Sequence, residues 1–263
     1  MNINILLTEI IEKYKNLLEE NLLGIYLHGS LVMGCFNNES SDIDFIVVVR
    51  EKLSFNIKRQ LIDILLDLSQ FAPKKGFEVS IILEKYSKNF IYPTPFELHY
   101  SNEYKERYIR DREFLCENGQ DADLAAHITI INKMGRCLYG KSISEVFGDV
   151  PEKYYINSIL KDIENAVDEI GENPVYTILN LCRVLYYLKE KVISSKQEGG
   201  NWGKRNYKAY EDLIEIALKV YSGNINEEKW NEKELKNFAA YMIEEINKTY
   251  KGRFMNFNIR DGS

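Results

Sequence analysis

Two short motifs in the N-terminal part of the chain carry side chains that can bind a phosphate and a metal ion. Gly29 and Ser30 end one apolar, β-prone run, and Asp42 and Asp44 stand at the start of a second one, residues 43–49. Glycine lets backbone amides approach a phosphate closely, and the serine hydroxyl adds a hydrogen-bond donor. Side chains two residues apart lie on the same face of a strand, so Asp42 and Asp44 can point at one divalent cation. Carboxylate oxygens suit Mg²⁺ that bridges substrate phosphates, which predicts phosphoryl-type transfer chemistry.

Glu78 is the candidate third carboxylate. Either motif alone would be weak evidence, but a Gly-Ser turn and an Asp-x-Asp pair at this spacing, between two apolar strands, resemble the nucleotidyltransferase superfamily related to DNA polymerase β. That resemblance implies a third acid on a neighbouring strand, and Glu78 is the only acid in the apolar run 77–83. The alternative is an ordinary strand glutamate that faces solvent.

The composition is that of a globular protein with a small partner. The chain has 263 residues, 45% hydrophobic and 28% charged, which is enough for one large domain or two modest ones. No apolar run reaches the roughly 18–20 residues of a membrane helix, and the amphipathic N-terminus is not a signal peptide, so we expect a cytoplasmic protein with no membrane partner. The net charge of −6, without a Lys/Arg stripe, argues against nucleic acid and favours a small cationic partner. Four scattered cysteines are expected to be free thiols: Cys35, Cys116, Cys137 and Cys182.

Hydrophobic periodicity predicts an α+β chain with two domains. Together with the resemblance, this pattern implies a nucleotidyltransferase domain over residues 1–150, with a mixed sheet and flanking helices, and an all-α helical bundle that binds substrate over residues 151–263. In the first domain the expected elements are helix 3–21, strand 22–28, strand 43–49, helix 55–71, strand 77–83, a loop from residue 93 into a helix through residue 112, and a helix from the turn at 119–126 to near residue 140. After Pro151 only helical stripes remain, and they predict a bundle of about four or five helices.

Further motifs resemble one branch of this superfamily. The chain is similar to the aminoglycoside nucleotidyltransferases over almost its whole length, and most similar to the branch that adenylylates spectinomycin and streptomycin. The motifs that carry the resemblance are Gly29-Ser30, residues 41–44, Glu78-Val79, Tyr92-Pro93, residues 123–125, residues 177–183, Ser195-Lys196 and residues 217–223.

The resemblance implies roles for the matched residues on the nucleotide side. Phosphate contacts would come from Gly29, Ser30 and Ser41, Mg²⁺ ligands from Asp42 and Asp44, support of the site from Asp123, and triphosphate contacts from Arg183, Lys196 and Tyr221. Glu78 would be the general base or a third metal ligand. Lys196 follows two serines in an expected loop, where a solvated surface lysine is the alternative. Core packing is the alternative for Tyr221. Arg183 lies in an apolar helix, where an arginine needs an anionic partner.

On the drug side the resemblance implies contacts from Glu78, Tyr100, Glu103, Tyr104, Asn173 and Tyr176. The dual streptomycin/spectinomycin enzymes have a tryptophan after the proline loop and an acid before the arginine helix. This chain has Tyr100, Glu103 and Tyr104 in the first place and Asn173 in the second, and both differences favour spectinomycin. Four acids are expected to pair with ammonium groups of the drug: Glu97, Glu103, Asp168 and Glu172. Trp202 and Trp230 are expected to pack.

The implied reaction moves AMP from ATP to a hydroxyl of an aminoglycoside or aminocyclitol antibiotic, with O-9 of spectinomycin as the first expectation. It uses Mg²⁺ and releases pyrophosphate, and its result would be antibiotic resistance from a cytoplasmic monomer. Two alternatives stay open. One is a nucleotidyltransferase for another small molecule or for a protein, of the AMPylating or antitoxin-like kind. The other is a catalytically silent ATP-binding protein.

Overall fold

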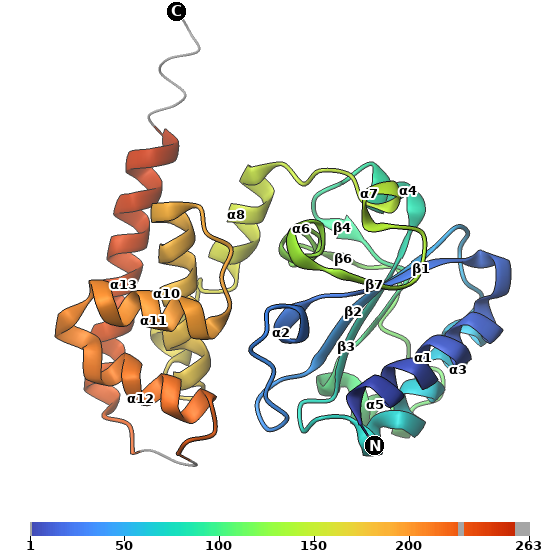
Figure 1. The fold of residues 1–263 in the computed structure, drawn as a ribbon, viewed down its shortest axis with the longest axis horizontal. Coiled ribbons are helices and arrows are strands. Elements are labelled where there is room, and N and C mark those ends of the chain that lie inside the picture. The colour runs from blue at the N-terminus through green and yellow to red at the C-terminus, as the bar shows by residue number, and fades with distance from the viewer. Residues whose placement is uncertain (1, 226–228, 256–263) are drawn as a thin grey trace, which may run out of the picture. The chain divides into compact units, whose positions relative to one another are not determined.

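A five-stranded mixed sheet forms the centre of the N-terminal part of the protein. The computed structural model describes residues 2–225 and 229–255, and the chain divides into two units, Met1–Ser158 and Ile159–Ser263. The strands of the main sheet are β1 (Leu22–Leu27), β2 (Ile43–Val49), β3 (Phe77–Leu83), β5 (Leu98–Tyr100) and β7 (Arg136–Gly140), in the order β5-β3-β2-β1-β7 (Figure 1). β2 and β3 run parallel, and the other neighbours run antiparallel.

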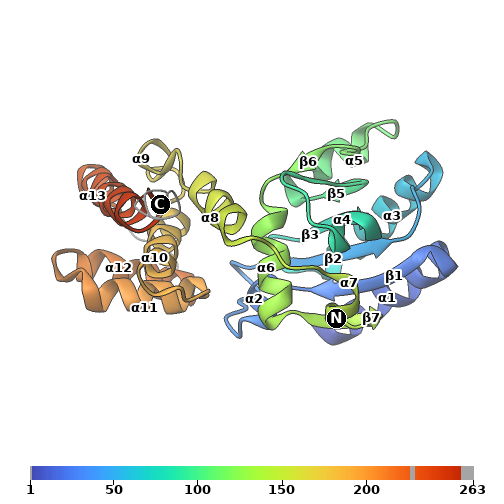
Figure 2. The same ribbon diagram turned by 90° about the horizontal axis from the view of Figure 1, so that it is seen from above.

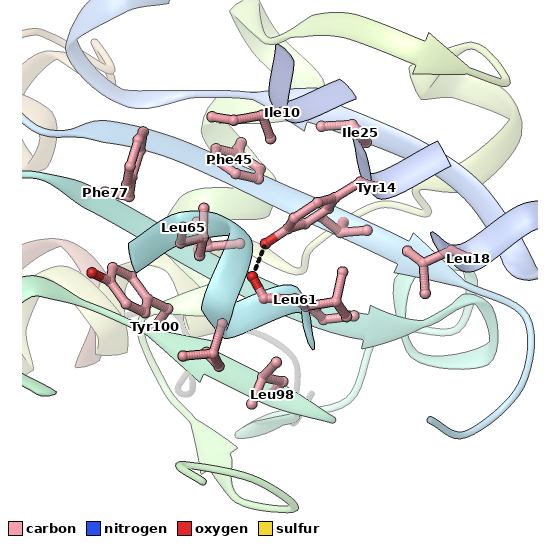
Figure 3. Packing of buried hydrophobic residues seen from close by; sticks show 14 of the residues in the cluster. Ile10, Tyr14, Leu18, Ile25, Phe45, Leu61, Leu65, Phe77, Leu98 and Tyr100 are labelled. Carbon is pink, nitrogen blue, oxygen red and sulfur yellow. Dashed lines mark hydrogen bonds between the residues drawn. The ribbon is translucent and has the colours of Figure 1, made fainter. Parts of the chain in front are cut away.

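Two helices cover one face of this sheet. These are α1 (Ile3–Leu18) and α3 (Phe55–Leu68), and α3 makes the crossover that a parallel strand pair requires. Their apolar stripes pack on alternate residues of β2, such as Phe45, in one core. Figure 3 shows this core, in which the buried Tyr14 hydroxyl donates to the Leu61 carbonyl oxygen at 3.4 Å.

The opposite face of the sheet packs on α6 (Leu124–Met134). Ile46 and Val48 of β2 join Leu124 and Ile128 of α6 in a second core. Both faces of β2 are therefore buried, as its unbroken apolar run predicts.

Short elements complete this part of the chain. They are η1 (Glu19–Asn21), α2 (Gly29–Val32), η2 (Ser69–Phe71), α4 (Glu84–Lys88), β4 (Thr94–Pro95) paired with β6 (Gln120–Asp121), η3 (Asn102–Tyr104), α5 (Lys105–Arg110) and α7 (Ile143–Val146).

The described residues of the second unit are helical apart from their connections. The helices are α9 (Ala166–Glu169), α10 (Pro174–Glu190), α11 (Lys196–Asn206), η4 (Lys208–Tyr210), α12 (Glu211–Tyr221), α13 (Glu232–Tyr250) and a final turn, η5 (Lys251–Met255). α8 (Glu152–Lys161) spans the division between the two units. α10 contacts α11, α12 and α13 and so forms the centre of the bundle, and Figure 2 shows it beside α11 and α13.

Glycines allow α11 to lie directly against α10. A Cβ atom at Gly199 would lie 2.6 Å from Arg183 Cγ, and one at Gly203 would lie 2.5 Å from Cys182 Sγ. Both distances are shorter than real Cβ contacts, so any larger residue would push the two helices apart. Glycine costs about 1 kcal/mol relative to alanine within a helix, and close packing is what these positions gain in exchange.

The fold confirms the predicted class and corrects three segments. The α+β class with a helical C-terminal part is confirmed, and β2 and β3 have the predicted bounds. The helix expected to reach residue 140 ends at Met134, because residues 136–140 pair with β1 as the edge strand β7. The segment 93–112 begins with β4 and β5 in place of a loop, since β5 pairs with β3, and the helix expected there is α5, which ends at Arg110. The expected loop around Lys196 is the start of α11.

Other expectations concern the chain as a whole. None of the four cysteines, all of which the structure describes, forms a disulfide. Among the described residues, no helix combines the length and the apolar character needed to cross a membrane. The expected domain boundary at residue 150 stays a prediction.

Candidate active site

Three carboxylates converge at one end of the parallel strand pair. Asp44 of β2 and Glu78 of β3 are register partners, and Asp42 stands two residues before Asp44. One oxygen atom from each of the three lies within 4.8 Å of those of the other two. Residues i and i+2 share a face of a strand, and so do register partners in a parallel pair, so strand geometry brings these acids together. The set of oxygen donors fits Mg²⁺.

The turn formed by Gly29 and Ser30 lies directly against this cluster. Gly29 has a φ of +66°, and a Cβ atom there would lie 1.9 Å from Asp44 Oδ2, so the position requires glycine. The Ser30 hydroxyl oxygen is buried and has no hydrogen-bond partner among the described residues, which suits a polar ligand such as a phosphate oxygen. Ser41 Oγ accepts the Asn37 backbone N–H at 3.1 Å and thereby holds the loop that precedes β2.

The surroundings of Glu78 disfavour its charged form. Burial is the largest cause that raises the pKa of this carboxyl, and the acids Asp42, Asp121 and Asp123 raise it further. His127 acts in the opposite direction, and its Nε2 atom lies 3.9 Å from Glu78 Oε1. A carboxylate with a raised pKa is the stronger base, which suits proton abstraction from a hydroxyl.

Two histidines beside the acids are absent from the sequence-based prediction. His28 is 3% exposed, and its ring centroid lies 4.6 Å from that of His127. Burial lowers the pKa of His28 well below its usual range, so this imidazole is neutral. His127 lies one helical turn beyond Asp123, the residue that precedes α6, and this spacing of four was the available signal in the sequence. Asp123 itself accepts the Ser158 hydroxyl at 3.3 Å.

In the helical unit, polar contacts join three of the expected ligands. The Tyr176 hydroxyl donates to Asp162 Oδ1 at 2.7 Å, and the Asn180 side-chain amide also donates to Asp162. The Asn180 side-chain oxygen accepts from Arg183 Nη1 at 3.1 Å. The ammonium group of Lys196 lies 4.3 Å from the centroid of the Tyr176 ring, within cation–π range. Tyr176, Arg183 and Lys196 therefore lie in one cluster, and Asp162 is a member that the sequence did not indicate.

Other expected residues of this unit lie at helix ends. Asn173 is the N-cap of α10 and is exposed, whereas Tyr221 ends α12 and is 8% exposed. Trp202 packs as expected, with its ring stacked on that of Tyr186 at a centroid distance of 5.0 Å. Trp230 is partly buried.

Two residues expected to contact the drug belong to the protein interior. Tyr100 is 1% exposed, because β5 pairs it with Val79, and its ring stacks on Tyr108 in the core under α1 and α3. It has no surface to offer a ligand, so this assignment is corrected. Glu97 is 5% exposed, and its Oε2 atom lies 3.6 Å from Lys58 Nζ, so it belongs to a buried ion pair and not to a drug site. Four remaining drug-side residues are accessible: Glu103, Tyr104, Asp168 and Glu172.

A mixed sheet whose parallel pair presents three converging acids beside a glycine-serine turn defines the protein as a nucleotidyltransferase of the DNA polymerase β type. The family model for the polymerase beta nucleotidyltransferase domain matches residues 8–94, and the model for the aminoglycoside adenylyltransferase C-terminal domain matches residues 145–245. With these two domains in this order, the chain belongs to the aminoglycoside nucleotidyltransferase family, as the sequence motifs predict.

Individual relatives agree with this assignment. The chain is 25% identical to a spectinomycin 9-adenylyltransferase of Enterococcus faecalis, over 82% of this chain and 87% of the relative. It is 26% identical to a spectinomycin 9-adenylyltransferase of Campylobacter jejuni (94% and 97%) and to an aminoglycoside (3'')(9) adenylyltransferase of Klebsiella pneumoniae (92% and 94%). The fold matches the crystal structure of spectinomycin adenyltransferase AAD(9) from Enterococcus faecalis with ATP and spectinomycin, with a TM-score of 0.82 and 23% identity over 94% of this chain and all of that chain.

Proposed function

We propose that this protein transfers the adenylyl group of ATP to a hydroxyl of an aminocyclitol or aminoglycoside antibiotic, O-9 of spectinomycin in the first place, and so gives resistance. The observation that carries the proposal is the convergence of Asp42, Asp44 and Glu78 within 4.8 Å, beside the turn at Gly29 and Ser30. Two relatives are named as spectinomycin 9-adenylyltransferases, and the similar crystal structure contains ATP and spectinomycin, which supports this choice of substrates.

The reaction forms a bond from the drug oxygen to the α-phosphorus of ATP and breaks the bond to the leaving pyrophosphate. Glu78 accepts the hydroxyl proton, a role that its raised pKa favours and that is typically worth about 10² to 10⁴ in rate. Asp42 and Asp44 would hold Mg²⁺, which when bound neutralises charge on the triphosphate. The Ser30 hydroxyl, buried and without a partner among the described residues, donates to a phosphate oxygen.

Glu78 has a second candidate role as a metal ligand, since one of its oxygens lies within 4.8 Å of an oxygen of each aspartate. The Glu78→Gln variant separates the two roles. If Glu78 is the base, Mg²⁺ affinity is retained while transfer falls by about 10²-fold or more. If it is a ligand, Mg²⁺ affinity falls as well.

The family resemblance supports further assignments. Ser41 and Asp123 would support the nucleotide site, and Arg183, Lys196 and Tyr221 would bind the triphosphate. Arg183 donates to the neutral oxygens of Ser194 and Asn180, and these bonds leave its charge available for a phosphate. The resemblance implies four further contacts to the drug: Glu103, Tyr104, Asn173 and Tyr176. Within this proposal the protein is a cytoplasmic monomer, and its acidic net charge of −6 suits a cationic drug and not a nucleic acid.

The decisive experiment combines growth and chemistry. A susceptible bacterium that expresses the protein is challenged with spectinomycin, streptomycin and lincomycin, and the purified protein is assayed for pyrophosphate release with Mg-ATP and each drug. We expect growth and pyrophosphate release with spectinomycin only. No protection and no release with any of the three would overturn the proposal. Transfer of labelled AMP to a protein in place of a drug would favour the AMPylating alternative.

Matched variants tie the activity to the site. Glu78→Gln and Asp42→Asn should each lower transfer by about 10²-fold or more while the protein stays folded. Glu84→Gln makes the same chemical change just beyond the other end of β3 and should leave transfer unchanged. Full activity in both Glu78→Gln and Asp42→Asn would mean that the acids are not the catalytic site.

A further inference from the structure

A pair of histidines whose rings pack together connects the glycine-serine turn to Glu78. His28 directly precedes that turn and is the N-cap of α2, and His127 comes from α6. The two rings are tilted by 32° with their centroids 4.6 Å apart, and His127 Nε2 lies 3.9 Å from Glu78 Oε1. α2 and α6 contact each other and lie side by side in Figures 1 and 2. The mechanism proposed above uses neither histidine.

His28 is held in place by its surroundings and packs against His127. Its backbone N–H donates to the Asp44 carbonyl oxygen at 3.0 Å, and only 3% of its surface is exposed. Burial keeps its ring neutral, so it does not repel an imidazolium beside it. A ring held in this way restricts the rotation of a ring packed against it.

His127 is held from the other side by its helix. Leu124 and Ile128, which flank it on α6, are both fully buried in the core against the sheet. With its backbone anchored and its ring packed against that of His28, the imidazole presents Nε2 toward Glu78. The nearby acids Asp42, Asp121 and Asp123 repel the Glu78 carboxylate, whereas His127 attracts it.

We propose that His127 is a positioning residue for Glu78, which it orients through an Nε2–H···Oε1 contact so that the other carboxylate oxygen faces the substrate hydroxyl. The donor is present in the Nε2–H tautomer and in the protonated ring, so the role does not depend on a change of charge. At 3.9 Å the contact is electrostatic, and catalytic hydrogen bonds are commonly long before substrates bind. This inference rests on the proposed adenylyl transfer for its kinetic consequences, and the contact itself can be measured without any reaction.

Two variants separate positioning from packing. His127→Gln keeps a side-chain N–H donor, and His127→Leu removes the donor and fills similar space. Replacing a residue that orients a functional group typically costs about 10- to 100-fold. We expect His127→Leu to lower kcat for spectinomycin adenylylation by that amount with the KM for ATP within about twofold, and His127→Gln to recover most of kcat. Loss of thermal stability with equal kcat in both variants, or no recovery in His127→Gln, would assign His127 to packing and overturn the inference.

A spectroscopic measurement tests the contact independently of activity. In the ¹⁵N-labelled wild-type protein without nucleotide, the His127 ring-nitrogen resonances should shift when Glu78 is changed to Gln, and should not shift with Glu84→Gln. Unchanged resonances in Glu78→Gln would refute the contact whatever the protein catalyses. If Glu78→Gln shifts the His127 resonances but the wild-type protein adenylylates no drug, the contact stands and the proposed function is refuted.

Discussion

Gly29→Ala is the substitution whose effect the structure predicts most sharply. An alanine Cβ would lie 1.9 Å from Asp44 Oδ2, and real Cβ contacts stay above 3.0 Å, so the Asp44 carboxylate must retreat by about 1 Å. A misplacement of about 1 Å in a catalytic group can cost about 10²-fold in rate. The left-handed backbone at Gly29 adds about 1–2 kcal/mol for a residue with a Cβ, which corresponds to a loss of about 2–8 °C in Tm.

Gly34→Ala is the matched control. Gly34 has a φ of +69°, nearly that of Gly29, but a Cβ there would meet nothing within 4 Å. Both variants should therefore lose similar thermal stability, while only Gly29→Ala loses about 10²-fold in kcat/KM. The assay is pyrophosphate release with Mg-ATP and spectinomycin, with Tm measured on the same preparations. If kcat/KM of Gly29→Ala stays within about threefold of that of Gly34→Ala, the collision with Asp44 is not what makes this glycine necessary.

Two further predictions concern stability. Lys58 is buried between Glu117 (2.6 Å) and Glu97 (3.6 Å), so Lys58→Met should destabilise the protein by about 3–5 kcal/mol in urea unfolding, because it leaves the buried Glu97 carboxylate without its cation. Adding Glu97→Gln should recover part of that loss, and a double variant no more stable than the single one would contradict this account. His28 has a lowered pKa in the folded state, so the unfolded chain binds a proton that the folded protein does not, and stability falls as pH drops below about 6.5, by at most about 1.4 kcal/mol per pH unit. Without Mg²⁺, unfolding free energies between pH 7 and 5.5 should fall less steeply in His28→Gln than in the wild type, and equal slopes would refute this origin.

The carboxylate cluster could be predicted because it depends on local rules. Asp42 and Asp44 share a strand face because they are two residues apart. Glu78 lies in the second of two apolar runs, and both runs are too short and too rich in β-branched residues to be helices. Two buried strands joined by a helix pair in parallel, which places the starts of both strands at the same edge. Each of these inferences depends only on residues within one strand or within one strand–helix–strand crossover.

The segments that were predicted wrongly depend on distant partners. Residues 136–140 follow a helix without a proline, and only their pairing with β1, more than a hundred residues earlier, makes them a strand. α11 carries three glycines in its first eight residues, so its helical propensity is poor. The capping box of Ser195 and Glu198 was the local signal for this helix, and close packing on α10 provides the remaining stabilisation.

Side chains alternate between the two faces of a strand, which explains why Tyr100 was a wrong choice for the drug site. The same alternation shows which residue of β5 lies on the face of Glu78. β5 pairs Tyr100 with Val79, which faces the core under α1 and α3, so Tyr100 must face that core too. Its neighbour His99 pairs with Ser80, which is on the Glu78 face, and His99 Nδ1 lies 3.0 Å from the Ser80 hydroxyl. A resemblance that aligns a segment within one or two positions cannot settle this, because neighbouring strand residues face opposite ways.

Because of the same alternation, the packing of the core fixes the positions of the acids in this sheet. Asp44 alternates with Phe45, whose ring is fully buried under α1 and α3, while Ile46 is buried against α6. A slip of β2 by one residue would turn Asp44 into the core and Phe45 toward Glu78, so the energy of two apolar interfaces holds the register against it. The cluster of like charges is unfavourable by itself, as the raised pKa of Glu78 indicates. Burial of β2 on both faces therefore provides the stability that keeps three mutually repelling acids within reach of one cation.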